Sequence, residues 1–128
     1  MSTRAKGIKM KGSTSTISRD DWGSFLDSFS RRHHGWLVQL DTHDRVTDEK
    51  VVSRELPLQS IKLDLEDEKH PRINVTVRFG NKVIKHILFL PSELVLQSSD
   101  GEPEQSLQVE TVNTETTIRL RAPEPFVR

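Results

Sequence analysis

The stretch Ser18–Leu40, SRDDWGSFLDSFSRRHHGWLVQL, contains the strongest structural signal in the chain. Ser18 is a favourable N-cap, and Gly35 suits the position with positive φ that ends a helix. The pattern predicts a helix over about residues 19–34 and a strand that begins at Trp36. The large apolar residues of this stretch recur at the spacing of one helical face: Trp22, Phe25, Leu26 and Phe29.

Downstream of the helix, apolar and polar residues alternate, which is the pattern of strands with one face in the core. Gly80-Asn81 separates two such segments and predicts a tight hairpin. The segment 83–90 is apolar on both sides, so we expect a central strand that is covered on both faces, by a curled sheet or by a second chain. The expected strands lie at 36–41, 61–66, 72–79, 83–90, 94–96, 107–112 and 116–121.

These segments predict an α+β fold, with one N-terminal helix packed on a mainly antiparallel, curled sheet of about six or seven strands. Short hairpin connections favour antiparallel pairing, because parallel strands need long crossovers. The basic, polar residues 1–17 bury too little surface to offset the entropy of ordering, so we expect a disordered tail there. A single helix-plus-sheet domain is expected over 18–122, and a short C-terminal tail over 123–128.

The composition excludes several classes of function. The 128 residues include 19 basic and 19 acidic side chains, and a net charge of zero argues against histone-like binding to polyanions. The absence of cysteine removes disulfides and thiolate metal sites. No apolar run reaches the length of a membrane span, and the N-terminal residues lack the apolar core of a signal peptide. We therefore expect a cytoplasmic protein without a membrane partner.

An acid-Trp pair opens the predicted helix at Asp21-Trp22, and Phe29-Ser30-Arg31-Arg32-His33 closes it before Gly35-Trp36. This arrangement resembles the opening of a family of small, uncharacterised bacterial proteins described as a domain of unknown function. Leu56-Pro57-Leu58 and Lys85-His86-Ile87 also resemble that pattern. The resemblance spans about residues 18–122 and implies a compact helix-plus-sheet domain in a bacterial cytoplasm. It implies no activity, substrate or catalytic residue.

Two histidines are candidate ligand-binding or pH-sensing residues. His33 continues the apolar face of the predicted helix, where its ring is either a functional group or a core side chain that bonds a terminal carbonyl. His86 shares a strand row with Ile84 and Leu88, so it is a hydrogen-bonded core residue or the polar tip of a pocket. The chain has no HxH or HExxH spacing. The one metal or acid–base hypothesis is therefore that both histidines converge beside an Asp, and no cofactor is implied.

A basic surface is a further candidate site, because several cations lie on predicted strands. Such a surface can bind a nucleic-acid backbone, but RNA-binding sheets also present exposed aromatic residues for stacking. Here Phe79 and Phe89 fall on apolar rows, which favours a charged solvent face that limits aggregation. The basic side chains are Arg72, Arg78, Lys85, Arg119 and Arg121.

Motifs for nucleophilic catalysis or phosphate binding, such as GxSxG and GxGxxG, are absent from the chain. We therefore expect a protein that is not an enzyme, but a module that binds a protein partner or forms a homodimer through its sheet. Weak nucleic-acid binding through the basic tail and strand face is the first alternative. A small-ligand or metal-binding protein centred on His33 and His86 is the second.

Overall fold

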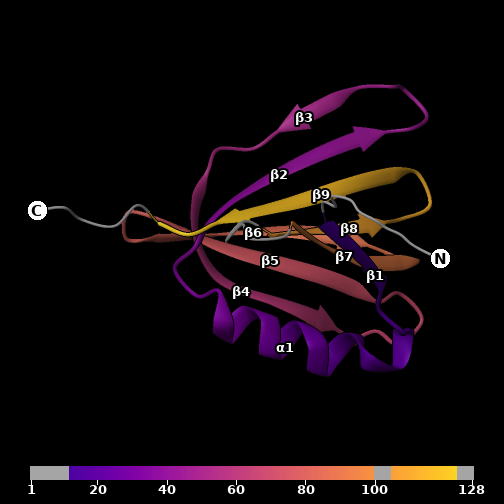
Figure 1. The fold of residues 1–128 in the computed structure, drawn as a ribbon. Coiled ribbons are helices and arrows are strands. Elements are labelled where there is room, and N and C mark those ends of the chain that lie inside the picture. Colours follow the sequence, from indigo (N-terminus) through magenta and orange to yellow (C-terminus); the bar gives the residue numbers. More distant parts are fainter. Residues whose placement is uncertain (1–11, 100–104, 124–128) are drawn as a thin grey trace, which may run out of the picture.

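The computed structural model describes residues 12–99 and 105–123, which contain one α-helix and nine strands (Figure 1). A 3₁₀ turn, η2 (Arg19–Asp21), leads into helix α1 (Trp22–Arg32). The α+β class is as predicted, and β1 and β3 are the strands beyond the predicted six or seven. The strands are β1 (Gly12–Thr16), β2 (Leu37–Asp44), β3 (Lys50–Val52), β4 (Leu56–Asp64), β5 (Arg72–Phe79), β6 (Lys82–Phe89), β7 (Glu93–Ser99), β8 (Gln105–Glu110) and β9 (Thr114–Arg121).

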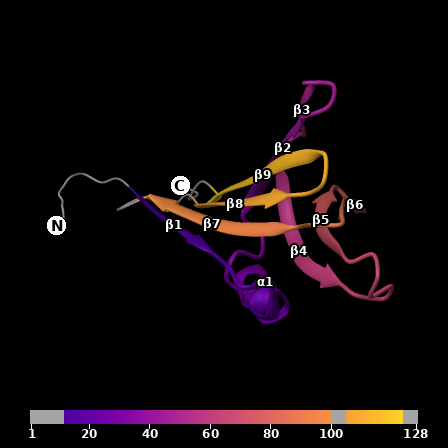
Figure 2. The same cartoon turned by 90° about the vertical axis from the view of Figure 1, so that its right-hand side faces the viewer.

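Every strand pairing in the described residues is antiparallel, in the order β1-β7-β8-β9-β2-β4-β5-β6, with β3 beside β2. The join between β2 and β4 is short, because the ladder runs only through Leu56 and Pro57. Beyond it β4 turns away from β2, as Figure 2 shows. We call β1, β7, β8, β9, β2 and β3 sheet A, and β4, β5 and β6 sheet B.

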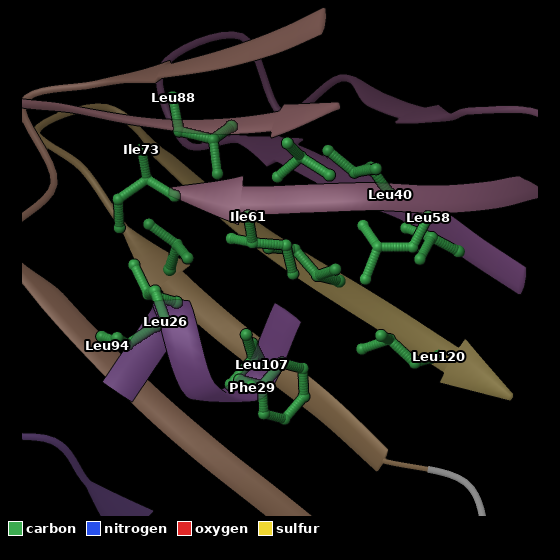
Figure 3. Packing of buried hydrophobic residues seen from close by; sticks show 14 of the residues in the cluster. Leu26, Phe29, Leu40, Leu58, Ile61, Ile73, Leu88, Leu94, Leu107 and Leu120 are labelled. Carbon is green, nitrogen blue, oxygen red and sulfur yellow. The ribbon is translucent and has the colours of Figure 1, made fainter. Parts of the chain in front are cut away.

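One apolar core joins α1 to the inner faces of sheets A and B (Figure 3). Alternate residues of each strand point into it, because successive side chains of a strand lie on opposite faces. The buried apolar residues are Trp22, Leu26 and Phe29 from α1, Val38 and Leu40 from β2, Leu58 and Ile61 from β4, Ile73, Val75 and Val77 from β5, Leu88 from β6, Leu94 from β7, Leu107 and Val109 from β8, and Ile118 and Leu120 from β9.

Helix α1 covers the part of the β4 edge that β2 leaves free. The apolar face predicted for the helix is buried there, with Leu26 and Phe29 fully enclosed. The hydroxyl of Ser30 donates to the carbonyl oxygen of Ile61 and accepts from the Ile61 N–H, both at 2.7 Å. The helix thus supplies the hydrogen bonds that a neighbouring strand would otherwise make.

The two ends of the helix compare differently with prediction. Gly35 has φ +86°, the left-handed conformation expected at the helix end. At the start, the Ser18 side chain makes no capping hydrogen bond, and its carbonyl accepts instead from the Asp21 N–H at 2.8 Å. The indole N–H of Trp22 donates to the Ile17 carbonyl at 2.9 Å, which anchors the chain where it enters the helix.

The prediction of a disordered tail over 1–17 is wrong for its last part. Gly12–Thr16 form β1, which pairs with β7 from Gly12↔Ser99 to Thr16↔Val95. Small serine and threonine side chains bury little surface, but backbone pairing with an existing strand edge orders them without it. Residues 1–11 of the tail and 124–128 of the predicted C-terminal tail lie outside the described residues.

Within the described chain, the prediction of a central strand at 83–90 is wrong, whereas its cover by a second chain stays a prediction. This segment forms β6, which pairs with β5 and lies at the end of the strand order. Only Leu88 is buried, whereas Val83 is 54% and Phe89 58% exposed. Apolar residues on both faces are typical of a central strand, but no described strand pairs with the free edge of β6, and most of its side chains are exposed.

Replacement of Ser30 by alanine tests whether α1 stabilises the β4 edge. Ser30→Ala leaves the buried Ile61 N–H without an acceptor, which costs about 1–3 kcal/mol. The free energy of unfolding, from denaturant titration, should fall by that amount. Ser24→Ala, at an exposed position of the same helix, should change it by less than about 0.5 kcal/mol. Equal effects of the two substitutions would contradict the bridging role of Ser30.

Candidate functional site

The β5–β6 hairpin sets which backbone groups of β6 face outward. Gly80, with φ +65°, and Asn81 form the predicted two-residue loop between Phe79 and Lys82. The residues that flank such a loop are a hydrogen-bonded pair, so even-numbered residues of β6 direct their N–H and C=O groups toward β5. The Leu90 N–H donates to the Pro71 carbonyl at 2.9 Å, which continues this pattern beyond the strand.

The odd-numbered residues of β6 therefore direct their backbone groups away from the sheet. These residues are Val83, Lys85, Ile87 and Phe89, and no described strand pairs with them. Leu90, with φ +54°, ends the strand before Pro91. An exposed row of backbone donors and acceptors is a template for pairing with another strand.

Apolar side chains concentrate around this edge on both faces of the hairpin. Six of the eleven exposed large apolar residues among the described residues belong to this hairpin or directly follow it: Phe79, Val83, Ile84, Ile87, Phe89 and Leu90. Contiguous exposed apolar surface of this kind marks interaction sites in soluble proteins.

A groove of about 730 Å³ lies between β6 and sheet A. Its walls are apolar, with Leu88 and Leu90 on one side and Val51 and Val112 on the other. Thr42 and Thr116, whose hydroxyl groups are 3.1 Å apart, also line it and join β2 to β9 by a side-chain hydrogen bond. Thr116 is fully buried, so of this pair only the half-buried Thr42 offers a hydroxyl group at the groove.

His86 lies at the groove and also lines a smaller adjoining cavity that includes Phe79 and Ile84. Neither of its ring nitrogens has a hydrogen-bond partner among the described residues. Burial lowers the pKa of His86, so its imidazole is neutral at neutral pH and offers one donor and one acceptor. Its geometry is that of the polar tip of a pocket, the second of the two interpretations that the sequence left open.

His33, by contrast, lies in the core at the end of α1. Its ring stacks on Phe29, with centroids 4.1 Å apart, and meets the edge of Trp36 at 4.6 Å. Its Nδ1 is 2.8 Å from the Phe29 carbonyl oxygen and donates to it. Burial lowers the pKa of His33, the hydrogen bond to Phe29 opposes that shift, and the charge of Arg32 adds to it. These contacts are those of a structural residue.

The structure does not bring the two histidines together. His33 lines none of the cavities that include His86. Within residues 12–99 and 105–123, no group of three or more His, Cys, Asp or Glu side chains could hold a metal ion. The hypothesis of a shared metal or acid–base centre therefore finds no support in the geometry.

The five predicted basic residues do not form one surface. Arg72, Arg78 and Lys85 lie in sheet B, whereas Arg119 and Arg121 lie in β9 of sheet A. Three of them have acidic partners: Arg72 with Asp64 at 2.9 Å, Arg119 with Asp41 at 3.5 Å, and Arg121 with Glu55 at 2.8 Å. This division disfavours the nucleic-acid alternative, which needs a continuous basic track.

Comparison with known protein families gives a match over most of the chain. Residues 13–126 match the family described as a family of unknown function, DUF5335. The chain belongs to that family. The resemblance read from the helix-to-strand junction is thereby confirmed, but it assigns no activity. No curated protein and no solved structure matches this chain significantly. No helix in the described part of the chain is long and apolar enough to cross a membrane.

Sequence reasoning missed the sheet A side of this site. Val51, Thr42 and Thr116 of the DUF5335 domain belong to three strands that only folding brings to one groove. One local signal was available. Thr42 and Thr116 continue the inner rows of Leu40 and Ile118, so a hydroxyl group replaces an alkyl group where each row leaves the core.

Acid should destabilise the DUF5335 domain through His33. Because burial lowers the pKa of His33 in the folded state, the unfolded chain binds protons more readily. The contribution of His33 to the unfolding free energy is complete above the unfolded-state pKa of about 6.5 and decreases as the pH falls below it. Urea titrations on both sides of that value measure this slope. His33→Gln should reduce it, and His34→Gln, at the exposed neighbour, should not; the reverse would contradict the assignment.

Proposed function

We propose that the DUF5335 domain is a non-catalytic binding module that receives an extended polypeptide segment along β6. The observation that carries the proposal is an unpaired edge strand with exposed apolar side chains on both faces. Strand addition at such an edge uses backbone hydrogen bonds for affinity and alternate side chains for specificity. The groove beside β6 would receive the side chains of the added strand that point inward.

The other strand edges support this choice by contrast. β1 is only five residues long, and its sequence Gly-Ser-Thr-Ser-Thr offers no apolar side chain. β3 has three residues, and α1 covers the free part of the β4 edge. Proteins commonly protect their edges by short strands or covering elements. Among the described strands, β6 alone combines eight residues, an open edge and apolar side chains on both faces.

A photo-crosslinking benzophenone amino acid in place of Phe89, introduced in cells of the source organism, tests this proposal. We expect one discrete covalent adduct, because Phe89 lies at the free edge and is 58% exposed. The same crosslinker in place of Val46, which is 73% exposed in the β2–β3 turn, should give no such adduct. Mass spectrometry of the adduct identifies the captured chain.

A matched pair of backbone variants shows whether the adduct depends on strand pairing. Lys85→Pro removes an outward N–H and should abolish the adduct, because an added strand loses a hydrogen bond and meets the proline ring. Lys85→Thr removes the same charge, keeps the N–H and should retain the adduct. An adduct that survives in Lys85→Pro, or no adduct in the unaltered chain, would show that β6 is not a strand-addition site.

A further inference from the structure

We propose that the strand added to β6 is β6 of a second copy of this chain, paired antiparallel about a two-fold axis that passes through His86. This inference rests on the proposed function, and it names the occupant. A two-fold axis perpendicular to a sheet pairs residues that lie on the same face of each copy. Sheet B would then continue from one copy into the other as a six-stranded sheet.

The outward backbone groups of β6 fit this pairing. With the axis at His86, Val83 lies opposite Phe89 of the second copy, and Lys85 lies opposite Ile87 of the second copy. Both pairs consist of odd-numbered residues, whose backbone groups face away from β5 in each copy. Each pair can therefore exchange both of its backbone hydrogen bonds, and no donor on the shared edge is left without an acceptor.

The side chains distinguish this register from its neighbours. An axis at Lys85 would place the two Lys85 ammonium groups directly opposite each other, which is destabilising. An axis at Ile87 would bring Val83 against Pro91 of the second copy, beyond the end of its strand. An axis at His86 places apolar residues opposite each other on both faces, with Ile84 against Leu88 on the inner face, and gives each lysine an apolar neighbour.

The proposed pairing also places inner-face side chains of the second copy beside the groove. His86, Ile84 and Leu88 belong to the face of β6 that looks toward sheet A. In the proposed dimer, the same three side chains of the second copy extend this face beside the groove of the first. Their apolar atoms would pack against Val51 and Val112 across it. Pairing of the two edges would thus bring the apolar side chains of β6 against those of the second copy on each face.

A cysteine scan along β6 tests both the partner and the axis. The chain has no cysteine, so one introduced thiol can form a disulfide only with a second copy. At the axis, facing Cα atoms of a non-hydrogen-bonded pair lie about 4.5 Å apart, within disulfide range. We expect His86→Cys to form a covalent dimer on mild oxidation. Ile84→Cys should not, because its thiols would lie about 13 Å apart along the strand.

The other outcomes of the scan are equally informative. A crosslinking maximum at Lys85→Cys or Ile87→Cys would overturn the axis at His86. No disulfide at any of these positions, with the unaltered chain a monomer by sedimentation, would overturn the second copy as occupant. In that case an adduct of another protein at Phe89 would leave strand addition standing, whereas the absence of any adduct would remove the proposed function as well.

The two-fold axis also predicts a pH dependence. It brings the two His86 rings together, and the other charged side chains lining the cavities around His86, Lys85 and Arg54, are both positive. Protonation of His86 therefore adds charge to a site without an acid. The dissociation constant of the dimer, measured by sedimentation, should rise as the pH falls through the pKa of His86, which burial holds below its usual value. His86→Asn should remove this rise; a pH-independent dimer of the unaltered chain would contradict the axis.

Discussion

The hydrogen bonds between Ser30 and Ile61 lie at the point where the sheet divides, and the rest of the structure depends on them. A strand that leaves its neighbour exposes backbone groups, and a buried unpaired N–H or C=O group is costly. Here the polar side chain of a helix satisfies those groups. The same helix inserts Leu26 and Phe29 between the two sheets. Helix α1 therefore satisfies the backbone groups of Ile61 where sheet B leaves sheet A.

The two edges of sheet B differ, because α1 covers the β4 edge and the β6 edge is open in the described structure. There, β6 has no covering element in the described structure, and its backbone groups, apolar side chains and groove all lie at one surface. Thr42 and Thr116 mark the boundary, because the inner rows of sheet A change there from alkyl to hydroxyl side chains. The molecule is thus asymmetric, because α1 closes one side of sheet B and no described element covers the other.

Local signals in the sequence predicted the local structure well. The apolar face of α1, the positive φ of Gly35 and the two-residue loop at Gly80-Asn81 each depend on a few neighbouring residues. The same reasoning failed for β1, because a Ser/Thr strand is ordered by the backbone of β7 and not by its own side chains. It placed β6 at the centre because an edge strand with apolar residues on both faces has the same local pattern as a central strand.

The candidate site could be predicted only in part, for a related reason. His86 could be singled out as a polar residue among apolar neighbours on one strand face. Its place at the edge of a groove matches one of the two predicted roles, the polar tip of a pocket. The far wall of the groove comes from residues distant in sequence, which strand alternation alone does not bring together. The basic residues were grouped by strand, but Arg72 and Arg119 belong to different sheets. Which residues share a sheet or a groove wall depends on strand order, and strand order cannot be read from neighbouring residues.

The pairing of β2 with β9 has a consequence for synthesis. Leu37 pairs with Arg121, and Asp44 with Thr114, so β2 cannot complete its pairing before β9 has been synthesised. Contacts so distant in sequence form slowly, and a ribosome delivers the N-terminal partner first. The β5–β6 hairpin forms between neighbouring segments, whereas one edge of β2 stays unoccupied until β9 has been synthesised. Sheet A is therefore completed only after the C-terminal strand has left the ribosomal exit tunnel.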